Sequence, residues 1–146
     1  MMKMPNTGVY PVYQNQFQVG TDKDNLNTIA DMASFSVSFD NGVEEWNPME
    51  QEGWKRRLMT AKSISISISG KRNVGDEGNN FVAGKAFKNG REAEGCLQWT
   101  FPDGTTVLFI DAVFSVTALG GGDSTNVAPL EFEVMSNGKP DVTPAL

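Results

Sequence analysis

The chain has 146 residues, of which 39% are hydrophobic, and it contains 15 glycines and 7 prolines. This is the length of one domain, enough to bury about two thirds of the unfolded chain's surface in a single core. The net charge of −6 argues against a dedicated nucleic-acid binder, which would carry a basic face. With no histidine and Cys96 as the one cysteine, the usual general base, the commonest metal ligand and an internal disulfide are also excluded.

The start of the chain and its hydropathy predict where the protein resides. Residues 1–6 lack the apolar stretch of a signal peptide, and no run is long enough to span a membrane. A lone cysteine fits a reducing compartment such as the bacterial cytoplasm. We therefore expect a protein that is made and kept in the cytoplasm unless it leaves by cell lysis, with no membrane association.

The first part of the chain predicts one strand between two irregular segments. Residues 1–31 are interpreted as an N-terminal arm and loop, although 9–19 are aromatic and β-prone. Residues 33–40 alternate apolar with serine side chains, the period of a half-buried strand, and Asn41-Gly42 offers a tight turn. Residues 43–61 break this pattern and predict a long inter-strand loop.

Alternation resumes over residues 63–69, and one helix is predicted over residues 76–89. Asp76 can cap the helix, and Asn89-Gly90 supplies a stop. Glycines inside it weaken it, so packing has to hold it in place. Its predicted apolar stripe consists of Phe81, Val82, Ala83, Ala86 and Phe87, and its last turn contains Lys85 and Lys88.

The second half predicts a hairpin and one more strand. Residues 97–101 and 105–117 flank a turn at Pro102-Asp103-Gly104, and residues 130–134 alternate again before a polar C-terminal tail over 139–146. The sum is about six or seven strands with one helix. We therefore predict a single domain over 1–146, an α+β and mostly β fold close to a β-sandwich or partial barrel with one flanking α-helix.

Catalytic interpretations are weak. Glu131 and Glu133 project from one face of a predicted strand and resemble a solvated or lumen-facing row more than a glycosidase pair. Cys96 has no histidine to activate it and is best explained as a small buried side chain. Residues 22–27 lack the glycine of a calcium loop, and 120–125 lack the ending of a phosphate loop. We assign no catalytic, cofactor-binding or metal-binding residue and expect no enzyme and no cofactor.

Two predicted strands present faces made of serine alone. Surface strands usually carry charged side chains that guard an edge against pairing. Their absence indicates either plain polar surface or a crowded, lumen-facing surface where long charged side chains are unwanted. The candidate lumen-facing residues are Ser34, Ser36, Ser38, Ser63, Ser65, Ser67 and Ser69.

The segment 43–59 combines tryptophan and methionine with acidic residues in its first half and basic residues in its second. This composition is typical of a protein-binding surface, and a head-to-tail contact closes into a ring or continues as a filament. The alternative is a loop folded back on its own core, anchored by its tryptophans. The candidate interface residues are Glu44, Glu45, Trp46, Glu50, Glu52, Trp54, Lys55, Arg56 and Arg57.

Several of these segments, in this order and spacing, resemble the major tail tube proteins of long-tailed, non-contractile bacteriophages. The resemblance extends over residues 8–141 and rests on 43–60, 62–67, 70–73, 75–79, 101–106 and 119–125. It implies a β-sandwich or partial barrel with one flanking helix, and hexameric rings whose inner sheets join into one barrel. Some relatives have an additional immunoglobulin-like C-terminal domain, which we do not expect here.

The resemblance also implies partners. The rings would stack into a virion tail tube that conducts the genome from the capsid to the host cell, and we expect residues 43–59 and the N-terminal arm to make the stacking contacts. Tail tip or initiator, tape measure and tail terminator proteins would contact the tube, and double-stranded DNA would pass through it without specific binding. Assembly would take place in the host cytoplasm.

Two other interpretations remain open at this point. One is a small β-sandwich binding module, for example for carbohydrate, with Trp46, Trp54 or Trp99 as an aromatic platform. The other is the tube of a related contractile or secretion system, which shares ring geometry and differs in its partners.

Overall fold

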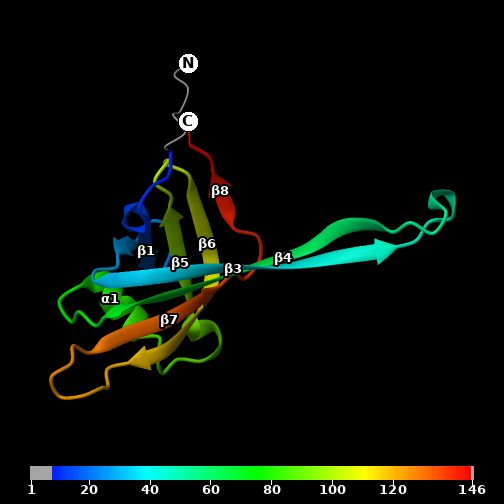
Figure 1. The fold of residues 1–146 in the computed structure, drawn as a ribbon. Helices are drawn as coiled ribbons and strands as arrows, with labels where there is room; N and C mark the ends of the chain where they lie inside the picture. Colours follow the sequence, from blue (N-terminus) through cyan, green and yellow to red (C-terminus); the bar gives the residue numbers. More distant parts are fainter. Residues whose placement is uncertain (1–7, 146) are drawn as a thin grey trace.

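The computed structural model describes residues 8–145, most of which are in antiparallel strands (Figure 1). The elements in chain order are η1 (Val12–Gln14), β1 (Gln16–Gly20), β2 (Leu26–Thr28), β3 (Met32–Trp46), η2 (Met49–Gln51), β4 (Arg56–Lys71), α1 (Glu77–Ala83), η3 (Gly90–Ala93), β5 (Glu94–Thr100), β6 (Thr106–Leu119), β7 (Pro129–Met135) and β8 (Asp141–Thr143).

One sheet runs through the whole fold in the order β2-β1-β5-β6-β7-β4-β3, with β8 added on β6. Strand β6 joins its two parts, because its first half pairs with β5 and its second half pairs with β7. The sheet curls back on itself, since the rings of Phe17 on β1 and Phe35 on β3 lie 4.8 Å apart. The prediction of a mostly β sandwich or partial barrel with one helix is confirmed.

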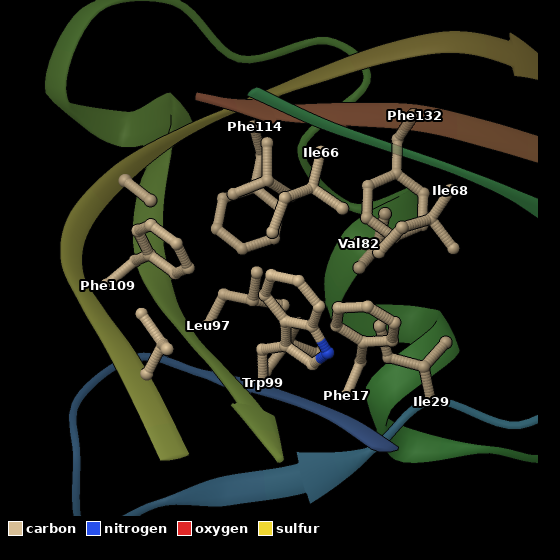
Figure 2. Close-up of a cluster of buried hydrophobic side chains, with 14 of the residues drawn as sticks. Phe17, Ile29, Ile66, Ile68, Val82, Leu97, Trp99, Phe109, Phe114 and Phe132 are labelled. Atoms are coloured by element: carbon tan, nitrogen blue, oxygen red, sulfur yellow. The ribbon is translucent and has the colours of Figure 1, made fainter. Parts of the chain in front are cut away.

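The core fills the space enclosed by this curled sheet. Figure 2 shows its aromatic and aliphatic side chains gathered between the two parts of the sheet and α1. The indole of Trp99 stacks on the rings of Phe17 and Phe101, and its Nε1 donates a hydrogen bond to Asn15 Oδ1 at 2.9 Å. The fully buried side chains include Val19, Ile66, Ile68, Val82, Leu97, Leu130, Phe132 and Val134.

Helix α1 begins as predicted and ends early. Asp76 caps it by accepting a hydrogen bond from Asn79 N at 2.9 Å. The helix ends at Ala83, where Gly84 follows and three-residue turns replace the helical pattern. The predicted extension to residue 89 is therefore wrong, and Phe87 is 90% exposed instead of lying in the apolar stripe.

The predicted loop over 43–61 is wrong, since β3 and β4 continue through most of it as a two-stranded hairpin. Asn41-Gly42 makes no turn, and Thr60 is the extra residue of a β-bulge opposite it. The chain reverses instead after η2, where Glu52 and Gly53 adopt left-handed φ angles of 53° and 90°. The residue that marks the turn is therefore Gly53, which follows the 3₁₀ helix η2 capped by Pro48.

Both ends of the chain also contain more sheet than predicted. Within the expected arm and loop over 1–31, β1 pairs with β2 and β5, so this segment is part of the sheet from Gln16 onward. Within the expected tail over 139–146, β8 pairs with the start of β6. Residues 1–7 and 146 lie outside the described part of the chain.

Candidate subunit interface

The two serine rows form one surface. The register of β3 and β4 places Ser34 opposite Ser69, Ser36 opposite Ser67 and Ser38 opposite Ser65. The hydroxyls of Ser34 and Ser69 are 2.8 Å apart and share a hydrogen bond. Sequence analysis identified each row, and the antiparallel register joins them.

Strands β7 and β6 extend this surface with glutamates. Glu131 and Glu133 are the register partners of Ser69 and Ser67, and Ser115 of β6 lies opposite Glu133 on the other side. Ser67 Oγ donates a long hydrogen bond to Glu133 Oε2 at 3.5 Å. We call the exposed side of these four strands the polar face. Its members are Ser34, Ser36, Ser38, Ser63, Ser65, Ser67, Ser69, Ser115, Thr117, Glu131 and Glu133.

The charge on this part of the sheet is mainly acidic. Its strand segments are 32–40 of β3, 63–71 of β4, 129–135 of β7 and 113–119 of β6. Their charged residues are Asp40, Glu131 and Glu133, together with Lys71 at the end of β4 opposite Pro129. The other side of the same strands faces the core. A surface of hydroxyls and carboxylates repels phosphates.

Both lateral edges of this four-stranded sheet lack a partner among the described residues. Strand β3 pairs with β4 alone, so its second edge is open. The part of β6 after Val113 pairs with β7 alone, because β5 begins at Glu94, opposite Val113. Long unguarded edges of this kind template pairing with another chain.

The hairpin of β3 and β4 projects far from the rest of the fold (Figure 1). We call residues 39–62 the arm. Each predicted interface residue from Glu44 to Arg57 lies on it, and its large apolar side chains are exposed: Met49 to 98%, Trp54 to 77%, Leu58 to 60% and Trp46 to 44%. The alternative in which the tryptophans anchor a loop to its own core is therefore wrong.

The acidic residues of the arm lie on its β3 side and the basic residues on its β4 side, and three of them pair across the hairpin. Glu45 accepts a hydrogen bond from Arg57 Nε at 2.7 Å, and Lys55 Nζ lies 3.5 Å from its other oxygen. The hydrogen bond from Arg57, reinforced by the charge of Lys55, lowers the pKa of Glu45. Lys55 and Arg57 are thus partly neutralised within the arm.

Sequence reasoning missed one feature of the arm. Phe39 and Val43 lie on the side of β3 that faces the core further along, yet they are 57% and 45% exposed because the strand has left the body there. Met59, the partner of Val43 across the hairpin, is 48% exposed. No local pattern signalled this, because the alternation of apolar and polar residues stops at Asn41-Gly42.

The residues considered above for catalysis or metal binding have structural roles. Cys96 is buried, and burial raises the pKa of its thiol, which keeps it protonated and inert. Asp22 accepts hydrogen bonds from Asp24 N and Asn25 Nδ2 within a polar turn. Among residues 8–145 no three acidic, histidine or cysteine side chains are placed to hold a metal ion. No helix in that range is long and apolar enough to cross a membrane.

The fold is that of chains found in phage-like tails. A chain from the tail of an empty gene transfer agent particle, with C6 symmetry, aligns over 93% of this chain and 100% of its own with a TM-score of 0.71 and 22% identity. A chain from the virion of a native gene transfer agent particle gives a TM-score of 0.69, at 21% identity and the same coverage.

Contractile systems share the fold at lower identity. A chain from the sheath–tube complex of an extracellular contractile injection system aligns with a TM-score of 0.64 and 15% identity, over 96% of this chain and 95% of its own. No protein-family model and no curated protein matches the sequence. The likeness therefore rests on three-dimensional structure.

Proposed function

We propose that this chain is the tube subunit of a phage-like tail, which assembles into hexameric rings that stack into a conduit for double-stranded DNA. One observation carries the proposal: a four-stranded sheet with a polar, acidic face ends in two open edges. The likeness to chains of gene transfer agent tails supports it.

The direction of the strands supports ring closure between copies. Three antiparallel steps separate β6 from β3, so these two edge strands run in opposite directions. The β6 edge of one copy can therefore pair with the β3 edge of the next and keep the antiparallel alternation. Such a contact joins two different surfaces, the head-to-tail geometry that closes into a ring.

A ring of six copies would be wide enough to conduct DNA. Six copies of four strands give a barrel of about 24 strands, more than the roughly 16 to 18 strands that already leave a water-filled channel. The polar face would line this channel, because the other side of the same strands is filled by the core. Its carboxylates would repel the phosphates of the duplex and let it slide.

The arm would make the contact between rings, together with the N-terminal residues. Its tryptophan and methionine side chains are 44% to 98% exposed and would provide the apolar centre that protein interfaces need. In the assembled tail, the tube would meet tip, tape measure and terminator proteins. The subunit would reside in the virion after assembly in the host cytoplasm.

Electron microscopy of the purified chain tests this function. We expect rings or tubes with an open centre as concentration rises, or on addition of a tail-tip complex. Arg56→Glu should leave rings that do not stack, because Arg56 has no ion-pair partner among the described residues, whereas Lys23→Glu in the β1–β2 turn makes the same charge change and should stack normally. A chain that stays monomeric at high concentration, even with tip proteins present, contradicts the proposal.

The tube of a contractile or secretion system is the second candidate, favoured by the likeness to the contractile injection system chain. Binding of a sheath protein to the outside of the assembled tube distinguishes it from a non-contractile tail. The carbohydrate-binding module loses one of its three platform residues, since Trp99 is buried in the core and hydrogen-bonded to Asn15.

A further inference from the structure

Two surfaces remain without a role in the tube as described so far. One is the exposed apolar side of the arm near its base, which we call the outer patch: Phe39, Val43 and Met59. The other is the segment that follows α1, residues 85–91, which we call the basic segment. Its sequence contains Lys85, Lys88 and Arg91, no acidic residue, and Phe87 at 90% exposure.

The basic segment lies beside the open edge of β6. A hollow of about 650 Å³ is lined on one side by residues of 85–94 and on the other by Val113–Val116 and Met135. Val113 is the last residue of β6 that pairs with β5, so the open edge begins at this hollow. Any strand that joined this edge would pass the basic segment.

The register within one copy indicates where the next copy's arm would lie. Val113, Met135, Ser65 and Ser38 form one row across β6, β7, β4 and β3. If β3 of the next copy pairs with the open edge of β6 so that this row continues, its residues beyond Ser38 run past Val113 toward the basic segment. These residues are the base of the arm, including Phe39 and Val43 of the outer patch.

The charges of the two surfaces are largely complementary, since three basic residues and one acidic residue, Glu94, line the hollow. From residue 39 to residue 54 the arm contains five acidic residues and no lysine or arginine, since its basic residues begin at Lys55 on the β4 side. The acidic strand is therefore the one with the open edge, on the side where the neighbour would lie. The acidic residues are Asp40, Glu44, Glu45, Glu50 and Glu52.

We infer that the basic segment is the lateral docking site for the arm of the neighbouring copy within a ring. Lys88 and Arg91 receive the acidic β3 side of that arm, and Phe87 covers its outer patch. The inference rests on the proposed function and deepens it, because it assigns the arm a contact within the ring in addition to its stacking contact. Buried apolar contact supplies affinity, and the charges fix which edges meet.

A pair of charge-reversed variants tests the contact. Variant A carries Lys88→Glu with Arg91→Glu, and variant B carries Asp40→Lys with Glu44→Lys. Lys85 is left unchanged, because its Nζ donates a hydrogen bond to Glu92 O at 2.8 Å within the fold. Each variant alone places like charges against each other, so we expect the concentration needed for ring formation to rise by about tenfold or more.

A 1:1 mixture of A and B should recover assembly. The acidic arm of A fits the basic segment of B, and the lysine arm of B fits the reversed segment of A, so the two alternate around an even-numbered ring. Sedimentation velocity and negative-stain microscopy distinguish monomers, single rings and tubes. Circular dichroism of each variant checks that the monomer fold is retained.

The outcomes separate this inference from the proposed function. If the unaltered chain forms rings and A or B alone does so equally well, or the mixture fares no better than either alone, the docking site is wrong and the tube remains. Single rings that fail to stack in A would also overturn it, because they place the contact between rings. An unaltered chain that never assembles overturns both.

Phe87→Ala tests the apolar half of the contact without changing charge. Since Phe87 is 90% exposed, the monomer should unfold as the unaltered chain does, while ring formation should need about tenfold more protein. Val74→Ala removes a 75% exposed apolar side chain elsewhere and is the matched control. Equal behaviour of the two variants would contradict the role of Phe87.

Discussion

The most informative single residue for the fold is Asn79, which is fully buried in α1. Its Nδ2 donates hydrogen bonds to the carbonyls of Lys71 at 2.9 Å and Ala30 at 3.2 Å, and its Oδ1 accepts one from Arg72 Nη1 at 2.9 Å. One side chain thus ties the helix to the end of β4 and to the start of β3. Buried polar groups are costly to leave unpaired, so this network fixes where α1 docks.

Removal of this side chain should destabilise the monomer. We expect Asn79→Ala to lower the free energy of unfolding by about 2 kcal/mol, because it leaves the part-buried carbonyls of Lys71 and Ala30 without this donor and removes one of the two hydrogen bonds of Arg72 Nη1. Asn80→Ala makes the same change at the next, exposed helical position and should cost less than about 1 kcal/mol. Urea denaturation of both variants measures the difference, and equal losses would contradict the network.

Glu45 provides a pH-dependent test of the arm. The Arg57 hydrogen bond and the Lys55 charge lower its pKa, so this pairing contributes stability above the unfolded pKa of about 4.3, which is lost as pH falls through the folded value. Arg57→Gln should raise the pKa of Glu45 toward its ordinary value, and Arg56→Gln should leave it unchanged. Titration of the Glu45 carboxyl by NMR measures both, and equal shifts would show that Arg57 has no special role.

At the scale of elements, the two glycines of the predicted helix differ in role, since Gly78 lies in α1 and Gly84 follows its last residue. A Cβ at Gly78 would lie 2.4 Å from the carbonyl oxygen of Thr28, a backbone atom of β2 that cannot easily move. At Gly84 the nearest atom is Asn80 O at 3.4 Å, an ordinary contact. Glycine is therefore required at Gly78, whereas a larger residue fits at Gly84.

Alanine substitution at the two glycines should give opposite results. Helix propensity alone favours alanine by about 1 kcal/mol at each position. Gly84→Ala should therefore leave the protein as stable or slightly more stable, whereas Gly78→Ala should destabilise it by about 2 kcal/mol because the helix is forced away from β2. Thermal unfolding of both variants measures the sign, and stabilisation by Gly78→Ala would contradict the close approach.

The long strands show which parts of the fold can be predicted from local sequence patterns. Residues 33–40 and 63–69 were predicted as strands because period-two alternation is a local signal. Their continuation into the arm was missed, since the bulge at Thr60 breaks the alternation and no core lies beneath Val43 to make the pattern apolar. The prediction that Phe87 lies in the apolar stripe was wrong for a related reason: its spacing matches a helix, but the helix ends before this residue.

At the scale of the whole molecule, the candidate surface depended on register, which no local pattern reveals. The serines of β3 and β4 were identified separately, but that they face each other, with Glu131 and Glu133 continuing the same side, follows from pairing over a large sequence separation. Likewise, the charge split of the arm was visible in sequence. Its meaning emerged once the acidic half was found on the strand with the open edge.

The acidic polar face leads to a prediction about how the assembled tube would interact with DNA. Glu131→Lys with Glu133→Lys would convert repulsion of phosphates into attraction within the channel. We expect assembled tubes of this variant to bind short duplex DNA with an affinity that falls steeply as salt rises, while unaltered tubes bind none at the same salt. Fluorescence anisotropy of labelled duplex measures both.

Asp24→Lys with Glu77→Lys is the matched control, because it makes the same change of net charge in the β1–β2 turn and in α1, away from the polar face. If net charge alone governed DNA binding, both double variants would bind equally. That result would contradict the proposal that the polar face lines the channel. If the face lines the channel, the control should behave as the unaltered tube. The lysine pair on β7 should then also slow release of DNA from the tube, because each new cation exchanges bound counterions for phosphate contacts along the whole length of the assembly.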